Sequence, residues 1–391
     1  MILSIITNFY IVRKMSIIDY GYVSLALSIV STAAVFVYQW SGSTILYVRN
    51  EKNVGSLNEV IWSRNIILSI TLLPTLILTL VFRGRINQYL SENLTGLLFI
   101  LLVSMMLSDY YTNYLLAKKQ QITSSLLGIS IRIVLLLLSV FLLKDIKTFL
   151  IINIISNIVF VAFLGCAEIQ DFFPLRFSLN TFKRSTSFSL WQAVGIISLS
   201  CSQSIASIII SNVTTIEEVS YYNVAFKVIS AIVAFESYIP LFFAPLLVDY
   251  YRNSQSSKLK HYFYKSRPKL LILGLISHML VFITSDWFIP LLFGNEYYNS
   301  ILVFKLLIVY SFFYLLIIFY SQYANVTYKY KLLQIINIVS AVVTILAAII
   351  LTPHYGAMGY ALANSVGLIV KFLALICFME PQIAKDCHLG R

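Results

Sequence analysis

The residues Asp19-Tyr-Gly-Tyr-Val-Ser-Leu-Ala26 form an acidic, turn-forming stretch that leads directly into a long apolar segment. A similar stretch, Glu218-Val-Ser-Tyr-Tyr-Asn-Val-Ala225, occurs half a chain later, so that Asp19 matches Glu218 and Ala26 matches Ala225. The repeat predicts two halves of similar plan. Duplicated halves within a membrane chain are a recurring feature of transporters, in which one half moves against the other.

The composition predicts an all-α polytopic membrane protein. Of the 391 residues, 59% are hydrophobic and only 11% are charged, and the mean hydropathy is +0.85. These values exclude a water-soluble core covered by a charged shell. Most apolar runs reach the roughly 20 residues that a helix needs to cross the hydrocarbon core. An outer-membrane barrel would alternate polar and apolar residues, whereas residues 133–143 are apolar except for Ser139.

Twelve transmembrane helices are predicted. The first apolar run, residues 1–12, is too short to span a bilayer comfortably, so the first helix is expected to be truncated at its start. The other spans are placed at residues 21–47, 61–82, 94–117, 123–143, 148–168, 188–210, 219–248, 270–293, 300–324, 332–351 and 357–378. Pro74, Pro240 and Pro245 are expected to interrupt their helices, and the alternative is a kink that packing by neighbouring helices tolerates.

These spans also predict a domain organisation. It consists of an N-terminal six-helix bundle over 1–168, a cytoplasmic linker over 169–187, a C-terminal six-helix bundle over 188–378 and a cytoplasmic tail over 379–391. Most basic residues, Arg64 and the 252–269 connection among them, are assigned to loops that follow even-numbered helices. By the positive-inside rule these loops and both termini are cytoplasmic.

The net charge of +12 does not indicate nucleic acid, because the basic residues are spread over short loops. The four cysteines have neither disulfide nor metal-site spacing. His261, His278, His354 and His388 are too scattered for a metal site and are expected to be loop or packing residues. The sequence therefore predicts no metal and no cofactor.

Four short motifs resemble the polysaccharide-biosynthesis (Wzx-type) flippases. They are Asp19-Tyr-Gly-Tyr22, Tyr221-Tyr-Asn-Val-Ala-Phe-Lys227, Leu292-Phe-Gly-Asn-Glu-Tyr297 and Pro353-His-Tyr-Gly-Ala-Met-Gly-Tyr-Ala-Leu-Ala363. Their order and spacing extend over nearly the whole chain. This family belongs to the multidrug/oligosaccharidyl-lipid/polysaccharide exporter superfamily, together with lipid II flippases and multidrug exporters.

The resemblance implies two six-helix bundles arranged as a V about a central cavity, in the bacterial inner membrane. It also implies a substrate, an undecaprenyl-pyrophosphate-linked oligosaccharide that is turned from the cytoplasmic to the periplasmic leaflet. O-antigen or lipopolysaccharide assembly is the context it suggests, with membrane lipids, a polysaccharide polymerase and a chain-length regulator as partners. The family offers no invariant motif from which functional residues can be transferred.

Basic residues at membrane depth are the candidates for substrate binding. A charged side chain at a helix centre costs about 2.5–3.5 kcal/mol on insertion scales, so it usually faces a cavity or a partner. We expect Arg132, Lys227, Lys305 and Lys371 to bind the pyrophosphate. For Lys305 and Lys371 the alternative is snorkelling to a nearby span end, whereas Arg132 is too central to do so easily.

Acidic residues at membrane depth are the candidates for ion coupling. Asp109 and Asn113 are four residues apart and share a helix face, and Glu236 lies four residues before Pro240. These three residues are expected to bind a proton or a sodium ion. The alternative for Asp109 is a neutral carboxyl group, or an ion pair with a basic neighbour such as Arg132.

Three other functions compete with a flippase. A multidrug or toxin exporter has the same architecture, but a site for organic cations would present acids, and here basic residues predominate at membrane depth. A membrane glycan polymerase would need a large outer loop with clustered functional groups, and the outer loops are short, so no enzyme activity is expected. A structural scaffold would tolerate neutralisation of the central charges.

Overall fold

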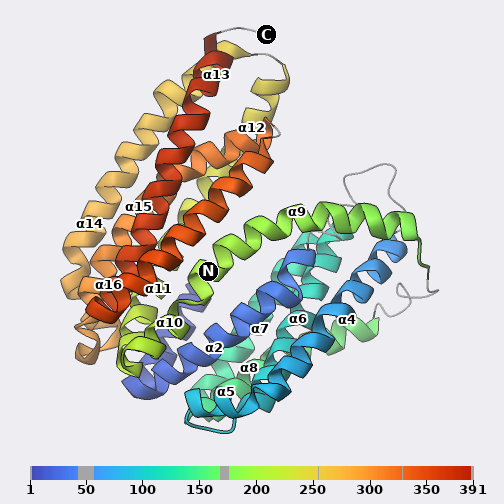
Figure 1. Cartoon of the computed structure of the whole chain (residues 1–391), viewed down its shortest axis with the longest axis vertical. Coiled ribbons are helices and arrows are strands. Elements are labelled where there is room, and N and C mark those ends of the chain that lie inside the picture. Colours follow the sequence, from blue (N-terminus) through green and yellow to red (C-terminus); the bar gives the residue numbers. More distant parts are fainter. Residues whose placement is uncertain (1, 43–56, 168–175, 254, 328, 389–391) are drawn as a thin grey trace. The chain divides into compact units, whose positions relative to one another are not determined.

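The computed structural model describes residues 2–42, 57–167, 176–253, 255–327 and 329–388. Within these ranges every regular element is a helix (Figure 1). Eight of the described helices are long and apolar enough to cross a membrane, and the last of them, Lys331–Cys387, is long enough to cross it twice. The predicted all-α polytopic membrane fold is therefore confirmed.

The described chain divides into two compact units, here called the first unit, Ile2–Ile208, and the second unit, Ile209–Arg391. The first unit contains α1 (Ile2–Lys14), α2 (Ile17–Val37), η1 (Gln39–Ser41), α4 (Leu57–Val81), α5 (Arg83–Tyr89), α6 (Thr95–Ala117), α7 (Gln121–Leu142), α8 (Ile146–Ala167) and α9 (Leu179–Ser204). After α10 (Ala206–Val213), the second unit contains α11 (Ile216–Glu236), α12 (Tyr238–Arg252), α13 (Ser256–His261), η3 (Tyr262–Ser266), α14 (Arg267–Phe293), η4 (Asn295–Tyr297), α15 (Ser300–Val326) and α16 (Tyr330–His388).

The boundary between the units lies later than the predicted linker. Helix α9 packs on α2 and α4, and its Ser204 carbonyl accepts a hydrogen bond from Ser28 Oγ at 2.7 Å. These contacts assign to the first unit a helix that the sequence pattern placed in the second bundle. Part of the predicted linker, residues 169–175, and part of the predicted tail, residues 389–391, lie outside the described residues.

The two copies of the internal repeat begin equivalent helices. Ser16 is the N-cap of α2 and Thr215 the N-cap of α11, so Asp19 and Glu218 both occupy the third helical position. Ser16 Oγ accepts a hydrogen bond from the Asp19 N–H at 3.1 Å, which caps the start of α2, and donates one to Asp19 Oδ2 at 2.7 Å. Ala26 and Ala225 are both fully buried. The alignment read from the sequence therefore holds in three dimensions.

Whereas Asp19 bonds to the N-cap residue of its own helix, Glu218 caps a helix in another part of the chain. The long helix α16 is broken at Gly356, whose φ of +57° and ψ of −135° are not helical. At this break Glu218 Oε2 accepts a hydrogen bond from the Ala357 N–H at 2.7 Å. Because a helix start leaves backbone N–H groups without partners and carries partial positive charge, a carboxylate stabilises it. One acidic side chain thus joins α11 to the last membrane segment.

Helix α8, the last helix of the predicted first bundle, begins instead with a local cap. Asp145 Oδ1 accepts hydrogen bonds from the side chain and the backbone of Thr148. These bonds, the side-chain bond most of all, lower the pKa of Asp145. Helix α8 is therefore capped within its own first turn, whereas the last membrane segment is capped from the distant helix α11.

Gly356→Ala is expected to destabilise the protein by about 1–3 kcal/mol, because this backbone conformation is essentially restricted to glycine. A Cβ at this position would also lie 2.5 Å from Glu218 Oε2 and displace the cap. The check is the melting temperature of the purified protein in detergent. Gly128→Ala is the matched control, since a Cβ there has no neighbour within 4 Å and alanine favours a helix interior. An unchanged melting temperature for Gly356→Ala would contradict the expectation.

Of the two predicted spans that were expected to be interrupted at proline, 61–82 and 219–248, only the second is interrupted. The chain breaks at Ser237 between α11 and α12, so that Pro240 lies in the first turn of α12, where proline is tolerated. Helix α4, in contrast, continues through Pro74, and α12 continues through Pro245. The prediction of interruptions at Pro74 and Pro245 was wrong, because a helix can absorb a single proline where its neighbours satisfy the freed carbonyl.

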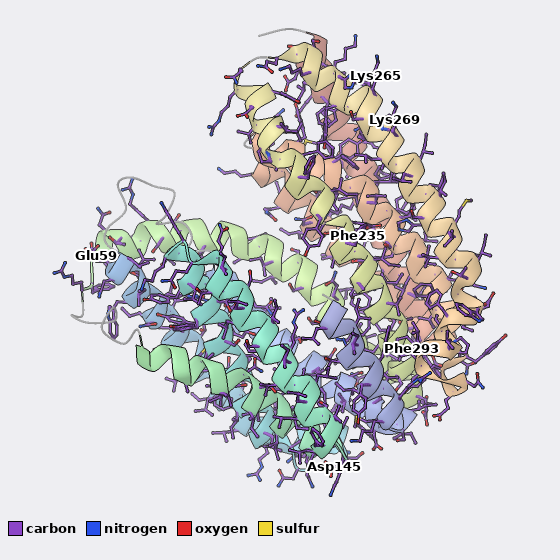
Figure 2. The ribbon with its side chains drawn as sticks, turned by 180° about the vertical axis from the view of Figure 1, so that it is seen from behind. Glu59, Asp145, Phe235, Lys265, Lys269 and Phe293 are labelled. Carbon is purple, nitrogen blue, oxygen red and sulfur yellow. The ribbon has the colours of Figure 1, made fainter. Side chains whose placement is uncertain are left out.

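Each unit has two ends that carry different residues (Figure 2). In the first unit Glu59 lies at one end and Asp145 at the other. In the second unit Lys265 and Lys269 lie at one end, Phe293 at the other, and Phe235 between them. The predicted basic connection over 252–269 is helical from Ser256 onward, so the polar loop expected there is shorter than predicted.

Candidate functional site

A buried ion pair joins two helices of the first unit. Arg64 Nη2 on α4 lies 2.9 Å from Asp109 Oδ2 on α6, and Asn113 Nδ2 donates to the same oxygen at 3.0 Å. The Arg64 side chain is fully buried, whereas that of Asp109 is 35% exposed. Asp109 and Asn113 therefore meet as predicted from their spacing. The carboxylate is an ion-pair partner of Arg64, which is the alternative stated for it, but with Arg64 in place of Arg132.

The surroundings of Arg64 are tightly packed. Its guanidinium lies 5.0 Å from the centre of the Tyr110 ring, and a Cβ on Gly42 would lie 3.2 Å from Asn113 Nδ2. Among the described residues Arg64 Nε and Nη1 have no hydrogen-bond partner. Two donors of this fully buried guanidinium therefore have no acceptor among the described residues. The described residues do not include 43–56.

The assignment of Arg64 to a cytoplasmic loop was wrong. Arg64 lies well inside α4, Leu57–Val81. A basic residue close to a span end is counted as a loop residue by the positive-inside rule, although an acidic partner on another helix lets it remain within the span. The available signal was that Arg64 lies within the predicted span 61–82.

A second ionisable pair lies in the second unit. Glu236, the last residue of α11, is 5% exposed. Its Oε1 lies 3.0 Å from His278 Nε2 on α14 and 3.5 Å from Ser311 Oγ on α15. His278 Nδ1 lies 2.7 Å from the Gly274 carbonyl oxygen. Three helices therefore meet at the break that follows Glu236.

The packing that brings His278 to Ser311 depends on a glycine. Gly274 is one turn before His278, and a Cβ at Gly274 would overlap Leu315, which is one turn after Ser311. The absence of a side chain lets α14 and α15 approach closely along both turns. His278 is therefore a functional candidate that sequence reasoning missed, having been expected to be a packing residue. The sequence did offer one signal of a functional role, because His278 lies inside the predicted span 270–293.

A cavity of about 150 Å³ adjoins this pair. Its lining is apolar apart from Glu236, Ser277 and His278. Among the described residues Glu236 Oε2 is buried and accepts no hydrogen bond. The pair is thus polar on one side, toward Ser311, and adjoins an apolar cavity on the other.

The four predicted substrate cations differ in their surroundings. Lys371 on α16 is 6% exposed, Lys227 on α11 is half-buried, and Arg132 on α7 is exposed. Within the described ranges none of these three forms an ion pair. Lys305 Nζ instead lies 2.7 and 2.8 Å from the two carboxylate oxygens of Asp286. Arg132 lies in the first unit, and the three lysines lie in the second.

Lys371 is more deeply placed than the sequence pattern indicated. It lies near the middle of the segment between Gly356 and His388, because α16 continues well beyond the predicted span end at residue 378. Its side chain is enclosed by the second unit instead of extending along the surface as a snorkelling lysine does. Of the charged side chains in the described part of the chain, Lys371 combines deep burial with the lack of an ion pair.

A third polar cluster was also missed. Arg267 on α14 forms two hydrogen bonds, of 3.2 and 2.9 Å, with the carboxylate of Glu380 on α16. Tyr320 on α15 donates to the same carboxylate at 2.7 Å. A bidentate arginine–carboxylate pair fixes geometry strongly, so this cluster holds three helices together near one end of the second unit. Among the described residues no group of three or more potential metal ligands is present.

Long apolar helices that carry buried ionisable pairs define a polytopic membrane protein in which such pairs are candidate functional sites. Residues 11–302 match the model of the family described as polysaccharide biosynthesis protein. Because this match covers well over half of the chain, the protein belongs to that family.

Several solved structures superpose on nearly the whole chain. A structure titled lipid II flippase MurJ, inward closed conformation, superposes with a TM-score of 0.79 at 14% identity, covering 99% of this chain and 87% of that one. An inward-facing multidrug resistance MATE family transporter of the MOP superfamily gives 0.78 at 12% identity, covering 98% and 94%. A MOP superfamily transporter from Pyrococcus furiosus gives 0.62 at 13% identity, covering 98% and 96%. No curated protein sequence matches the chain.

Proposed function

We propose that this protein is a flippase that moves undecaprenyl-pyrophosphate-linked oligosaccharide repeat units from the cytoplasmic to the periplasmic leaflet by alternating access. The observation that carries the proposal is the match to the polysaccharide biosynthesis family in a chain whose fold is similar to that of a lipid II flippase. The protein would lie in the bacterial inner membrane with both termini in the cytoplasm. O-antigen or lipopolysaccharide assembly, with a polymerase and a chain-length regulator, is the proposed setting.

The charge of the membrane-depth residues supports an anionic headgroup. A pyrophosphate that leaves water needs fixed positive charge, which arginine supplies in bidentate fashion and lysine as a point charge. Arg132, Lys227 and Lys371 are available for this role, because none is held in an ion pair within the described ranges. Lys305 is the weaker candidate, since both oxygens of Asp286 already bind its ammonium group.

The second candidate function is export of drugs or toxins, which the similarity to a multidrug MATE transporter favours. A site for organic cations requires unpaired acids. In this protein Asp109 is paired with Arg64, and Glu236 with His278. The charges that remain unpaired at membrane depth among the described residues are basic, so the anionic substrate fits better.

The sidedness of the lipid-linked oligosaccharide in cells tests the proposal. In cells that lack the protein, labelled repeat units are expected only after permeabilisation of spheroplasts, and the intact gene is expected to restore labelling from outside. Units that reach the outer leaflet normally but remain unpolymerised would instead indicate a polymerase. Normal sidedness together with increased drug sensitivity would indicate the exporter.

Neutralising the headgroup cation of the first unit gives a residue-level test. Arg132→Gln is expected to lower surface exposure of the repeat units at least severalfold at unchanged protein level, because a pyrophosphate contact is lost. The matched control is Arg83→Gln, an arginine in the short exposed helix α5. Unchanged exposure in Arg132→Gln would remove this residue from the proposed site.

A further inference from the structure

We propose that Glu236 and His278 bind one exchangeable proton between them, and that this pair is the proton-binding site that couples translocation to a proton gradient. The coupling rests on the proposed function. The inference of a shared proton depends only on the geometry of the second unit.

The position of one imidazole proton follows from the contact with Gly274. A carbonyl oxygen can only accept a hydrogen bond. Since His278 Nδ1 lies 2.7 Å from the Gly274 carbonyl oxygen, Nδ1 carries a proton and donates it. In the neutral ring the other nitrogen, Nε2, then has a lone pair and no proton.

That lone pair faces a carboxylate oxygen. Nε2 lies 3.0 Å from Glu236 Oε1, and two acceptors do not approach this closely without a proton between them. The Ser311 hydroxyl cannot supply it for both atoms, because it has one proton and lies 3.1 Å from Nε2 and 3.5 Å from Oε1. A further proton therefore lies between Nε2 and Oε1, as an imidazolium facing a carboxylate or as an imidazole facing a carboxylic acid.

In either form the Glu236–His278 pair carries no net charge, so burying it costs less free energy than burying a charged pair would. Loss of the shared proton to water would leave a net negative charge in a buried position, at high cost. Among the described residues no other charged group acts on Glu236 or His278. The hydroxyl of Ser311 faces the pair from α15, and on the same helix Tyr314 contacts Ser237, the residue that follows Glu236, at 3.3 Å.

The pair occupies a place where a change of charge can move the backbone. Glu236 ends α11, and α12 begins two residues later, after Ser237. Loss of the proton would replace an attraction between α11 and α14 by repulsion between two acceptors. The adjoining cavity of about 150 Å³ is lined mainly by apolar side chains, and its polar groups come from Glu236, Ser277 and His278. Binding and release of the proton would thus change how the α11–α12 break packs on α14.

Histidine-selective nitrogen NMR of the purified protein tests the shared proton. The chain has four histidines, so replacing His261, His354 and His388 by glutamine leaves the signal of His278 alone. We expect His278 near neutral pH as the imidazolium or as the Nδ1–H tautomer. The Nε2–H tautomer would overturn the proposal. In Glu236→Gln we expect a fixed neutral Nδ1–H ring that no longer titrates with the pair, and an unchanged titration would also contradict it.

Translocation in proteoliposomes tests the coupling. With lipid-linked oligosaccharide extracted from the host cells, an imposed proton gradient is expected to accelerate translocation, and this acceleration is expected to be lost in Glu236→Gln and in His278→Gln. His354→Gln, the same change at an exposed histidine, should retain it. Acceleration by a sodium gradient in place of a proton gradient would overturn the coupling. If the wild-type protein moves no lipid, the proposed function fails, while the NMR result still decides the proton pair.

Discussion

Asp109→Leu is expected to lower the stability of the purified protein by about 3–5 kcal/mol, because removing one partner of a buried ion pair leaves an uncompensated charge. The remaining Arg64 is fully buried and keeps its charge, since arginine does not deprotonate in proteins. Arg64→Leu is expected to cost less. The remaining Asp109 is 35% exposed and can become neutral by binding a proton.

The double variant Arg64→Leu/Asp109→Leu separates this explanation from a simple loss of packing. Replacing both partners removes both charges, so most of the stability is expected to return. The melting temperatures in detergent of the wild-type protein, the two single variants and the double variant form a double-mutant cycle. The pair Lys305–Asp286 is the matched control, because its side chains are 22% and 59% exposed and such pairs contribute about 1 kcal/mol or less. A double variant as unstable as Asp109→Leu would contradict the account.

Lys371→Met is expected to raise stability and lower translocation. A lysine buried without an ion pair is costly, on the order of 3 kcal/mol at a helix centre, and methionine keeps the length of the side chain without its charge. If the ammonium group binds the pyrophosphate, the same change removes a headgroup contact. Opposite changes in stability and function are typical of residues kept for activity.

The measurement pairs the melting temperature with surface exposure of the repeat units in complemented cells. Lys269→Met is the control, since Lys269 is exposed and lies at one end of the second unit (Figure 2). We expect the control to change neither quantity appreciably. A lower melting temperature for Lys371→Met, or full surface exposure, would refute the role proposed for Lys371.

The elements of the fold could be predicted from the sequence because apolar runs of sufficient length have few alternatives in a membrane. The match of Asp19 to Glu218 was also visible, since both belong to short similar stretches that begin a helix. The contacts of helix α9 with α2 and α4 could not be predicted in this way, because they join segments that are far apart in the chain.

The candidate site was only partly predictable for the same reason. Asp109 and Asn113 share a face within one helix, so their spacing placed them together. The partners of the two acids could not be read in this way, because Arg64 lies 45 residues from Asp109 and His278 lies on a different helix from Glu236. The hydrogen bond from Ala357 to Glu218, which spans 139 residues, gave no sequence signal at all.

Translocation by the purified protein is the most direct test of the flippase proposal. Lipid-linked oligosaccharide from the host cells, labelled on its glycan, is reconstituted into proteoliposomes with the protein, and an impermeant reagent is added outside. We expect the reagent to reach nearly all of the label when the protein is present, and only the outer-leaflet share in protein-free vesicles and in vesicles containing the heat-denatured protein. The same outer-leaflet share with folded protein would contradict the account.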